Sequence, residues 1–385
     1  ALKDADFVTT QFRVGLLEAR IKDERIPLSY GMLGQETNGA GGIFKAFRTI
    51  PVILDIVEDM KELCPNAWLI NFTSGMITEA VIKYGKWDRC IGLCNVPTIA
   101  MMKEPIALNV DPNELIYQFV GLNHFHWHKV YDKDGNELTS KVIDAMLDGK
   151  DVGLPANINN VPFFGEQIRE MNMIPCGYHR YYYRQQEMLE HSLMEYETIG
   201  TRGQQVKETE NKLFELYKNP NLDHKPEELS KRGGAYYSDA ACECINAIYN
   251  NKQTHMVVST KNRGAIPELP EDSIVEVSCY IGAKGAMPVA WGKLPSAQRG
   301  WLQCMKAMEE CTIEAAVTGN YGLALEAFTL NELIPSGENA KRVLDELLIA
   351  HKNYLPQFKS TIEKLEKENV TIKDSVVNEI IAHER

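Results

Sequence analysis

The first part of the chain alternates short apolar runs with helical patterns. Apolar runs lie around Phe7, at residues 67–73 and at residues 91–97, each bounded by polar or glycine-rich segments. Between them, apolar spacing predicts helices over residues 43–63 and 76–84, the first containing a proline that kinks or breaks it. Strands that alternate with helices are typical of an α/β layer with parallel strands, which we expect over residues 1–118.

Beyond residue 118 the pattern changes. A hairpin turn signal occupies residues 132–135, and residues 256–260 and 273–278 alternate as antiparallel strands do. Helical patterns occur at residues 203–217, 296–318, 320–333 and 338–354, and another follows residue 239 and ends at residue 249. We therefore expect an α+β domain over residues 119–385.

Composition narrows the class of protein. The chain has 385 residues, 24% of them charged, and a net charge of −12. This is typical of a globular protein and argues against general affinity for nucleic acid or anionic membranes. No apolar run approaches the roughly 20 residues of a membrane helix. Nine cysteines without regular spacing favour free thiols in a reducing compartment, so we expect a cytoplasmic protein.

Cys94 and His124 are candidate metal ligands. Cys94 ends a predicted strand, and His124, His126 and His128 alternate, so a strand would point all three the same way. A thiolate and an imidazole suit a borderline divalent metal, and two protein ligands leave positions open for a substrate. The alternative stays open, because a cysteine on an apolar strand is usually a core residue and no Cys-x-x-Cys pair accompanies it.

Other polar residues fall where ligands bind in α/β proteins. Asn71, Thr73, Ser74, Cys94 and Asn95 lie at the predicted carboxyl ends of strands. A glycine-dense loop at residues 35–42 precedes a helix and can present N–H groups to a phosphate. It does not match Gly-x-Gly-x-x-Gly, and such loops are more often turns.

Several motifs occur in a fixed order: Gly34-Gln-Glu-Thr37, Trp68-Leu-Ile-Asn-Phe-Thr73, Cys94-Asn-Val-Pro97, Gly121-Leu-Asn-His124 and Tyr178-x-x-Tyr-Tyr182. Together they resemble glycoside hydrolase family 4, and most its 6-phospho-β-glucosidases. The resemblance implies an NAD-binding Rossmann-type domain over 1–118 and a domain related to lactate and malate dehydrogenases over 119–385. It also implies NAD and a divalent metal, usually manganese, as cofactors, and a homodimer or homotetramer.

The resemblance assigns roles to individual residues. Cys94 and His124 match the metal ligands, and Tyr178 matches the general base. Arg13 and Arg202 match positions that bind substrate, through its phosphate, although for Arg202 a surface role fits equally well. The implied reaction passes a hydride from C3 of the sugar to NAD, removes the C2 proton, expels the aglycone, adds water and returns the hydride. Ordinary glycosidases instead use two carboxylates.

Asn95 bears on the substrate. The α-specific phosphoglucosidases of this family carry Asp after the metal-binding cysteine, and an amide cannot act as an acid there. Asn95 therefore favours a β-linked substrate such as cellobiose 6-phosphate, hydrolysed to glucose 6-phosphate and an aglycone. A 6-phospho-α-glucosidase, an NAD-dependent hydroxyacid dehydrogenase and a non-catalytic sugar-phosphate sensor are the alternatives.

The sequence departs from the family pattern in two places. The leading strand and glycine-rich NAD loop are expected before residue 1, and an Asn-Pro dipeptide is expected between Thr73 and Ser74. Residues missing from the sequence would explain both, and a chain break between Thr73 and Ser74 would support this hypothesis. The basicity of Tyr178 also needs an explanation, because an unperturbed tyrosine pKa is about 10; the metal, Arg180 or Arg184 is expected to lower it.

Overall fold

The computed structural model describes residues 1–72, 75–231 and 236–384. Its contacts divide the chain into two compact units, each assembled from separate stretches. The unit formed by Ala1–Phe12, Ile53–Tyr183 and Gly234–Gln303 contains every strand of the described residues and is called the sheet unit. The unit formed by Arg13–Val52, Arg184–Gly233 and Cys304–Arg385 is called the helical unit.

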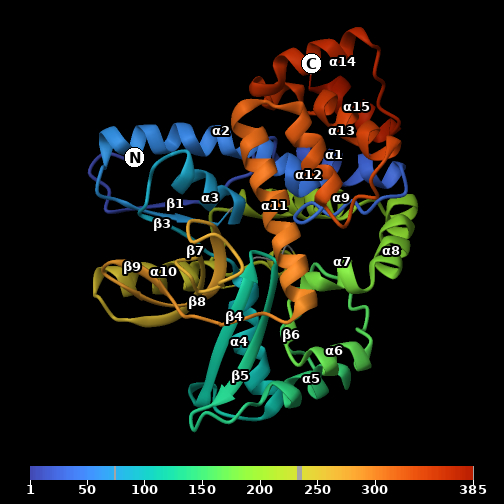
Figure 1. The fold of residues 1–385 in the computed structure, drawn as a ribbon. Helices are drawn as coiled ribbons and strands as arrows, with labels where there is room; N and C mark the ends of the chain where they lie inside the picture. Colours follow the sequence, from blue (N-terminus) through green and yellow to red (C-terminus); the bar gives the residue numbers. More distant parts are fainter. Residues whose placement is uncertain (73–74, 232–235, 385) are drawn as a thin grey trace. The chain divides into compact units, whose positions relative to one another are not determined.

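A six-stranded sheet forms the centre of the sheet unit (Figure 1). Its strands, in spatial order, are β1 (Phe7–Thr10), β2 (Trp68–Asn71), β3 (Cys90–Gly92), β7 (Thr254–Lys261), β8 (Ile274–Gly282) and β9 (Gly285–Pro288). The first three strands are parallel, as the sequence predicted, and β7, β8 and β9 continue the sheet in antiparallel pairing. The predicted domain boundary near residue 118 stays a prediction. Strands from both sides of that position belong to this one sheet.

One row of residues crosses this sheet at the carboxyl ends of the parallel strands. The paired residues are Thr10, Asn71, Gly92, Ser259 and Glu276. Directly paired residues point to the same face of a sheet, so this row places polar side chains side by side. A Cβ at Gly92 would lie 2.5 Å from the Thr78 hydroxyl oxygen and 2.8 Å from the Ser259 Cβ. Glycine at this position therefore lets its polar neighbours approach.

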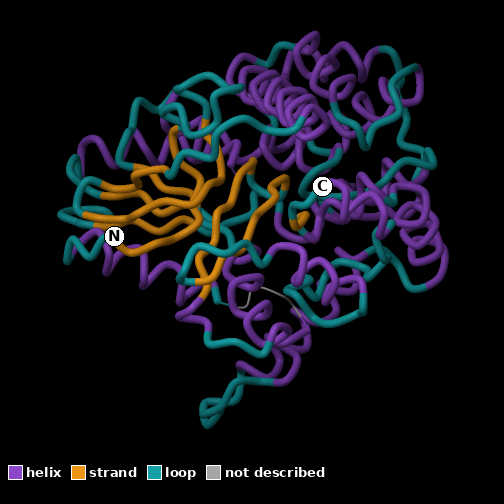
Figure 2. The backbone as a smooth tube through the Cα atoms, turned by 60° about the horizontal axis from the view of Figure 1, so that its bottom comes forward, coloured by secondary structure: helices purple, strands orange, loops and turns teal. Residues whose placement is uncertain are grey.

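A second, three-stranded sheet consists of β4 (Leu115–Leu122), β5 (Phe125–Asp132) and β6 (Ile174–Pro175). Figure 2 shows the strands of the sheet unit as orange segments. β4 and β5 form an antiparallel hairpin in which Leu122 pairs with Phe125, leaving two residues for the turn. Phe119 and Val130 from this hairpin pack with Ala100, Val142 and other apolar side chains into a buried core.

Helices of the sheet unit surround these strands. They are α3 (Gly75–Lys83), α4 (Asn95–Leu108), α5 (Thr139–Leu147), α6 (Gly165–Met171), α7 (Arg180–Tyr183) and α10 (Tyr237–Tyr249). The helix that begins at residue 95 was not predicted, because it is apolar on all sides and contains Pro97 and Pro105. Pro97 is tolerated since it lies in the first turn, where its missing N–H has no intrahelical partner to lose.

The described residues of the helical unit contain helices and connecting segments. The helices are α1 (Leu16–Ser29), α8 (Gln185–Thr198), α9 (Arg202–Tyr217), α12 (Tyr321–Leu330), α13 (Glu338–Ala350), α14 (Lys359–Lys367) and α15 (Ser375–His383), with parts of α2 (Ala40–Leu63) and α11 (Ser296–Thr318). Aromatic pairs fill its core, with ring centroids 6.1 Å apart for Phe44 and Phe328 and 5.0 Å apart for Phe47 and Phe358. Across the described part of the chain, every helix is too short or too polar to cross a membrane.

Candidate active site

Cys94 lies at the start of a helix rather than in a strand. The sequence predicted a strand through this residue, but β3 ends at Gly92 and Cys94 is the N-cap of α4. Its sulfur accepts a hydrogen bond from the Val96 N–H at 3.5 Å. The exposed N–H groups and dipole of a helix N-terminus favour negative charge, so this position suits a thiolate.

His124 lies in the tight turn between β4 and β5, not in a strand. Its φ of 61° is in the left-handed region, which non-glycine residues adopt uncommonly. The expectation that His124, His126 and His128 point the same way is therefore wrong for His124. The other two occupy alternate positions on β5, with ring centroids 5.4 Å (His126) and 4.3 Å (His128) from that of Phe119.

Cys94 and His124 are brought together at the carboxyl edge of the parallel strands. The Cys94 Sγ lies 3.2 Å from the His124 Nε2. Donor atoms that share one metal lie about 3–3.6 Å apart when the bonds are about 2.0–2.3 Å, so the pair fits a common metal ion. No group of three or more histidine, cysteine or acidic side chains able to hold a metal occurs among the described residues. A two-residue site leaves coordination positions for substrate oxygens.

The Cys94 thiol is held in its protonated form while no metal is bound. Burial raises its pKa well above the usual value, and the negative charge of Glu276 raises it further. A divalent cation reverses this balance because it binds the thiolate. Metal binding at this pair therefore releases a proton.

Tyr178 lies against the metal-ligand pair. It belongs to the short 3-10 helix Gly177–His179 that follows β6, and its ring centroid is 4.3 Å from that of His124. The side-chain amide of Asn157 donates a hydrogen bond to the Tyr178 hydroxyl at 3.4 Å. The structure thus brings three predicted site residues, Cys94, His124 and Tyr178, together.

The two arginines expected to lower the Tyr178 pKa have other partners. Arg180 donates hydrogen bonds to the Val161 carbonyl and the Asn160 side chain, both at 3.0 Å. Arg184 pairs with Glu187 in the helical unit. These contacts hold both guanidinium groups in place, and the expected effect of either arginine, or of a bound metal, on Tyr178 stays a prediction.

Asn95 is the first residue of α4 and follows the candidate ligand Cys94 directly. It is buried, with 9% of its surface exposed. Its role toward the substrate stays a prediction. Thr73 and Ser74, the site of the expected chain break, lie outside the described residues.

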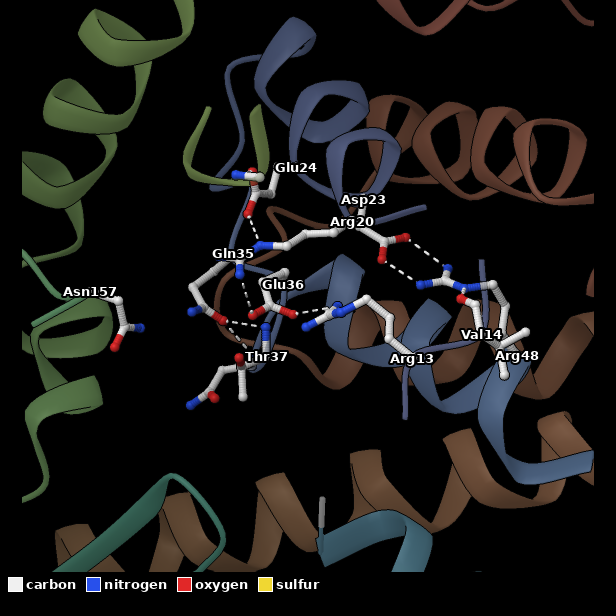
Figure 3. A network of polar contacts seen from close by, with 12 residues as sticks. Arg13, Val14, Arg20, Asp23, Glu24, Gln35, Glu36, Thr37, Arg48 and Asn157 are labelled. Carbon is white, nitrogen blue, oxygen red and sulfur yellow. Dashed lines mark hydrogen bonds and ion pairs between the residues drawn. The ribbon is translucent and has the colours of Figure 1, made fainter. Parts of the chain in front are cut away.

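In the helical unit, Arg13 takes part in a cluster of charges. Its Nη1 lies 3.0 Å from Oε2 of Glu36, and Nη1 of Arg20 lies 3.6 Å from the other oxygen of Glu36. Figure 3 shows Arg13 and Glu36 pointing toward one another. Burial by itself would raise the pKa of the Glu36 carboxyl, but the charges of Arg13 and Arg20 hold it well below its usual value.

Arg202 begins α9 and belongs to the same cluster. Burial lowers its pKa, and the positive charge of Arg20 lowers it further, which places the two arginines within electrostatic reach. Thr201 and Gln204 form a capping box that fixes this helix start. The charges of Glu24 and Glu195 also act on Arg202, so arginines and carboxylates alternate in this cluster. Guanidinium groups of this kind can bind phosphate.

Sequence reasoning missed Arg20, Glu36 and Lys45 of this cluster. The buried amine of Lys45 has a pKa lowered to about 8, first by burial and then by the charge of Arg13. Two signals were available: Glu36 lies in the motif at residues 34–37, and Arg20 is spaced four residues from Glu24, to which it is bound at 2.7 Å. Sequence spacing alone did not connect these segments.

The glycine-dense loop at residues 35–42 is a self-capped turn. The Gln35 side-chain oxygen accepts hydrogen bonds from the N–H groups of Thr37 and Asn38, both at 2.6 Å (Figure 3). α2 begins at Ala40, inside the predicted loop. These two N–H groups are satisfied within the loop, so the turn reading fits better than the phosphate-binding one.

Comparisons with known proteins identify the family of the chain. Residues 1–109 match the model described as family 4 glycosyl hydrolase, and residues 119–334 match that of its C-terminal domain. The chain belongs to glycosyl hydrolase family 4, as the resemblance implied. It is therefore an enzyme of the glycosidase class.

Relatives from several bacteria resemble most of the chain. It is 54% identical to a protein named probable 6-phospho-beta-glucosidase from Bacillus subtilis, over 94% of this chain and 83% of that protein. It is 46% identical to the 6-phospho-beta-glucosidase of Escherichia coli, over 95% and 83%. A structure of the Thermotoga maritima 6-phospho-beta glucosidase with manganese, NAD+ and glucose-6-phosphate matches with a TM-score of 0.83 and 33% identity, over 92% of this chain and 83% of that one.

Proposed function

We propose that this chain hydrolyses 6-phospho-β-glucosides to glucose 6-phosphate and an aglycone, with NAD and a divalent metal, manganese, as cofactors. The observation that carries the proposal is the Cys94–His124 pair, 3.2 Å apart, with the Tyr178 ring packed against the histidine. The names of the relatives at 54% and 46% identity support the substrate class. The titles of structures solved with NAD and manganese support the cofactors.

Cys94 and His124 would hold the metal. When bound, a divalent cation stabilises negative charge on sugar oxygens as a Lewis acid, and NAD accepts and returns a hydride at C3. The carboxyl ends of β1, β2 and β3 form the kind of sheet edge at which α/β proteins bind such ligands. The residues present therefore fit the metal, and NAD would lie along this edge.

Tyr178 acts as the general base in this proposal. Its hydroxyl oxygen takes the proton from C2 of the oxidised sugar, after which the aglycone leaves from C1. Burial of the ring beside His124 keeps the hydroxyl in one place and excludes water from it. The Asn157 amide, which donates to the same oxygen, stabilises the tyrosinate form.

Arg13 and Arg202 bind the phosphate of the substrate in this proposal. Guanidinium groups bind phosphate oxygens in a two-pronged geometry, and three of them lie in this cluster beside Glu36 and Glu24. The net charge of −12 repels anions at long range, so local cations must provide the affinity.

Asn95 supports the β-linked substrate. It stands directly after Cys94, where an acidic residue could donate a proton to a leaving group. An amide has no such proton at neutral pH, so the aglycone leaves with help from water or none. We also propose a cytoplasmic homodimer or homotetramer; the nine free cysteines support a reducing compartment.

Turnover of 4-nitrophenyl β-glucoside 6-phosphate with NAD and manganese chloride tests the proposal. The expected result is release of nitrophenol with no net NADH and, in heavy water, deuterium at C2 of the glucose 6-phosphate formed. The α-anomer and the unphosphorylated glucoside serve as controls and should react much more slowly. Product without label would remove the elimination route. Net NADH would favour a hydroxyacid dehydrogenase, and binding without turnover would favour a sensor.

A further inference from the structure

Glu276 is a carboxylate with no exposed surface in the middle of β8. It ends the polar row that crosses the six-stranded sheet, and the hydroxyl of its paired neighbour Ser259 lies 3.5 Å from its Oε2. A buried carboxylate is costly unless its oxygens have partners. Its partners therefore indicate what the charge is for.

The two oxygens of Glu276 contact the turn that carries His124 and the strand that follows it, β5. Oε2 accepts a hydrogen bond from the Asn123 side-chain amide at 2.9 Å, and Oε1 lies 2.8 Å from Nδ1 of His126. These contacts lie one residue before and two residues after His124. One side chain from β8 thus holds the metal-ligand turn from both ends.

β8 also contacts the strand that precedes the turn. Two residues beyond Glu276, the Ser278 hydroxyl accepts a hydrogen bond from the Phe119 N–H at 3.0 Å and donates one to the Tyr117 carbonyl at 3.2 Å. β4 is therefore fixed to β8 just before the turn begins. On the other side, a Cβ at Gly75 would lie 3.1 Å from the Asn123 Cβ, so the turn is also packed against the start of α3.

The turn needs such support because His124 adopts a left-handed backbone conformation, with φ of 61°. Residues in this region relax unless the surrounding structure fixes them. If the backbone of His124 relaxed, its ring would leave the position 3.2 Å from the Cys94 sulfur. The clamp from Glu276 therefore determines whether the two donor atoms face one cation.

We propose that Glu276 is a positioning residue for the metal, which holds the His124 turn against Cys94 and places a negative charge beside the ligand pair. The proposal rests on the metal-binding part of the proposed function. It differs from a purely structural role because it predicts weaker metal binding in a chain that remains folded. Partners of ligating residues commonly alter metal affinity by about 10- to 100-fold.

Manganese affinity of the purified full chain, without NAD or substrate, tests this proposal. Free Mn²⁺ is measured by electron paramagnetic resonance during titration, and folding is followed by circular dichroism. Glu276→Gln keeps the shape of the side chain but removes its charge, and its amide cannot satisfy both neighbours. We expect the dissociation constant to rise about 10- to 100-fold.

The chain offers a matched control in Glu104. This carboxylate also has no exposed surface, and its Oε1 lies 2.7 Å from Nε2 of His128 on the same strand. Its partner His128 lies two residues further from the turn than His126. Among the described hydrogen bonds and ion pairs, none joins Glu104 to Asn123 or His126. Glu104→Gln should therefore change manganese affinity less than twofold, although it costs comparable stability.

Asn123→Ala removes one of the two contacts of Glu276. It is the test variant if Glu276→Gln does not fold. It should weaken manganese binding by a smaller factor than Glu276→Gln and leave the fold intact. Manganese affinity within twofold of the wild type in both variants would overturn the proposal, as would equal losses in the Glu276 and Glu104 variants. Wild-type chain that binds manganese without hydrolysing the β-glucoside would refute the proposed function alone.

Discussion

The metal-ligand pair of the sheet unit and the arginine cluster of the helical unit suit ligands of opposite charge. They differ in when their own charge forms. The Cys94 thiol carries no charge while no cation is bound, since burial raises its pKa well above the usual value. Arg13, Arg20 and Arg202 carry guanidinium groups, which stay protonated in proteins, although burial lowers the pKa of Arg202. The metal-ligand pair thus forms its charge on binding, whereas the guanidinium groups of the arginine cluster hold theirs throughout.

Glu276 and Glu36, one carboxylate from each region, act in opposite directions. Glu276 adds negative charge next to donor atoms that are to bind a cation. Glu36 instead neutralises part of the positive charge around it, and keeps the arginines ordered between binding events. The same residue type therefore favours ligand binding directly in one region and organises the binding groups in the other.

Cys94→Ser is the most severe way to break the cation site. A serine hydroxyl does not ionise near neutral pH and is a poor ligand for a borderline metal. We expect manganese affinity to fall by more than about 100-fold, because loss of a ligand should cost more than loss of a residue that only supports a ligand. Turnover should be undetectable. Titration with manganese and hydrolysis of 4-nitrophenyl β-glucoside 6-phosphate check this. Retained turnover at saturating manganese would remove Cys94 from the site.

Tyr178→Phe should separate chemistry from metal binding. It removes the proposed base but keeps the ring that packs on His124. We expect kcat to fall about 10²- to 10⁴-fold, the usual contribution of general acid–base catalysis. The manganese dissociation constant should stay within twofold of the wild type. Near-normal turnover in this variant would mean that another group removes the C2 proton.

Arg202→Ala tests the anion site. Hydrogen bonds to charged groups contribute about 1.5–3 kcal/mol, so glucose 6-phosphate should bind about 10- to 100-fold more weakly. Manganese affinity should not change. Lys207→Ala provides the control, because Lys207 lies on the same helix and forms a partly exposed ion pair with Glu18 at 2.6 Å. Equal effects of the two substitutions would show only a loss of general positive charge.

The sequence predicted those features of the two regions that depend on local sequence pattern. Parallel strands at residues 7–10, 68–71 and 90–92 followed from short apolar runs separated by helical spacing. The family resemblance predicted that Cys94 and His124 meet, and the structure places them 3.2 Å apart. Their local settings were predicted wrongly, since a helix N-cap and a left-handed turn replace the expected strands.

What local pattern could not predict depends on contacts between distant segments. Glu276 and Asn123 are separated by 153 positions, and a glutamate within an alternating strand usually faces solvent. α1 was missed for a related reason: Lys22, Asp23, Glu24 and Arg25 follow one another in it and are all buried. Their partners, such as Arg48 for Asp23 and Asp374 for Arg25, come from other helices. No helical stripe of apolar residues marks such a segment.

The two regions should respond differently to pH above neutrality. Because burial and Glu276 raise the pKa of the Cys94 thiol, metal binding must expel its proton, and the metal-bound state holds fewer protons than the free one. Manganese affinity should therefore rise about tenfold per pH unit between pH 7 and 8. In the arginine cluster Glu36 stays ionised over this range, whereas Lys45, with a pKa lowered to about 8, loses part of its charge, so the affinity for glucose 6-phosphate should fall by at most about twofold. Titrations of both ligands at pH 7.0, 7.5 and 8.0 measure the two slopes. A flat manganese slope would mean that Cys94 is already a thiolate in the free protein, and the two sites would then be prepared in the same way.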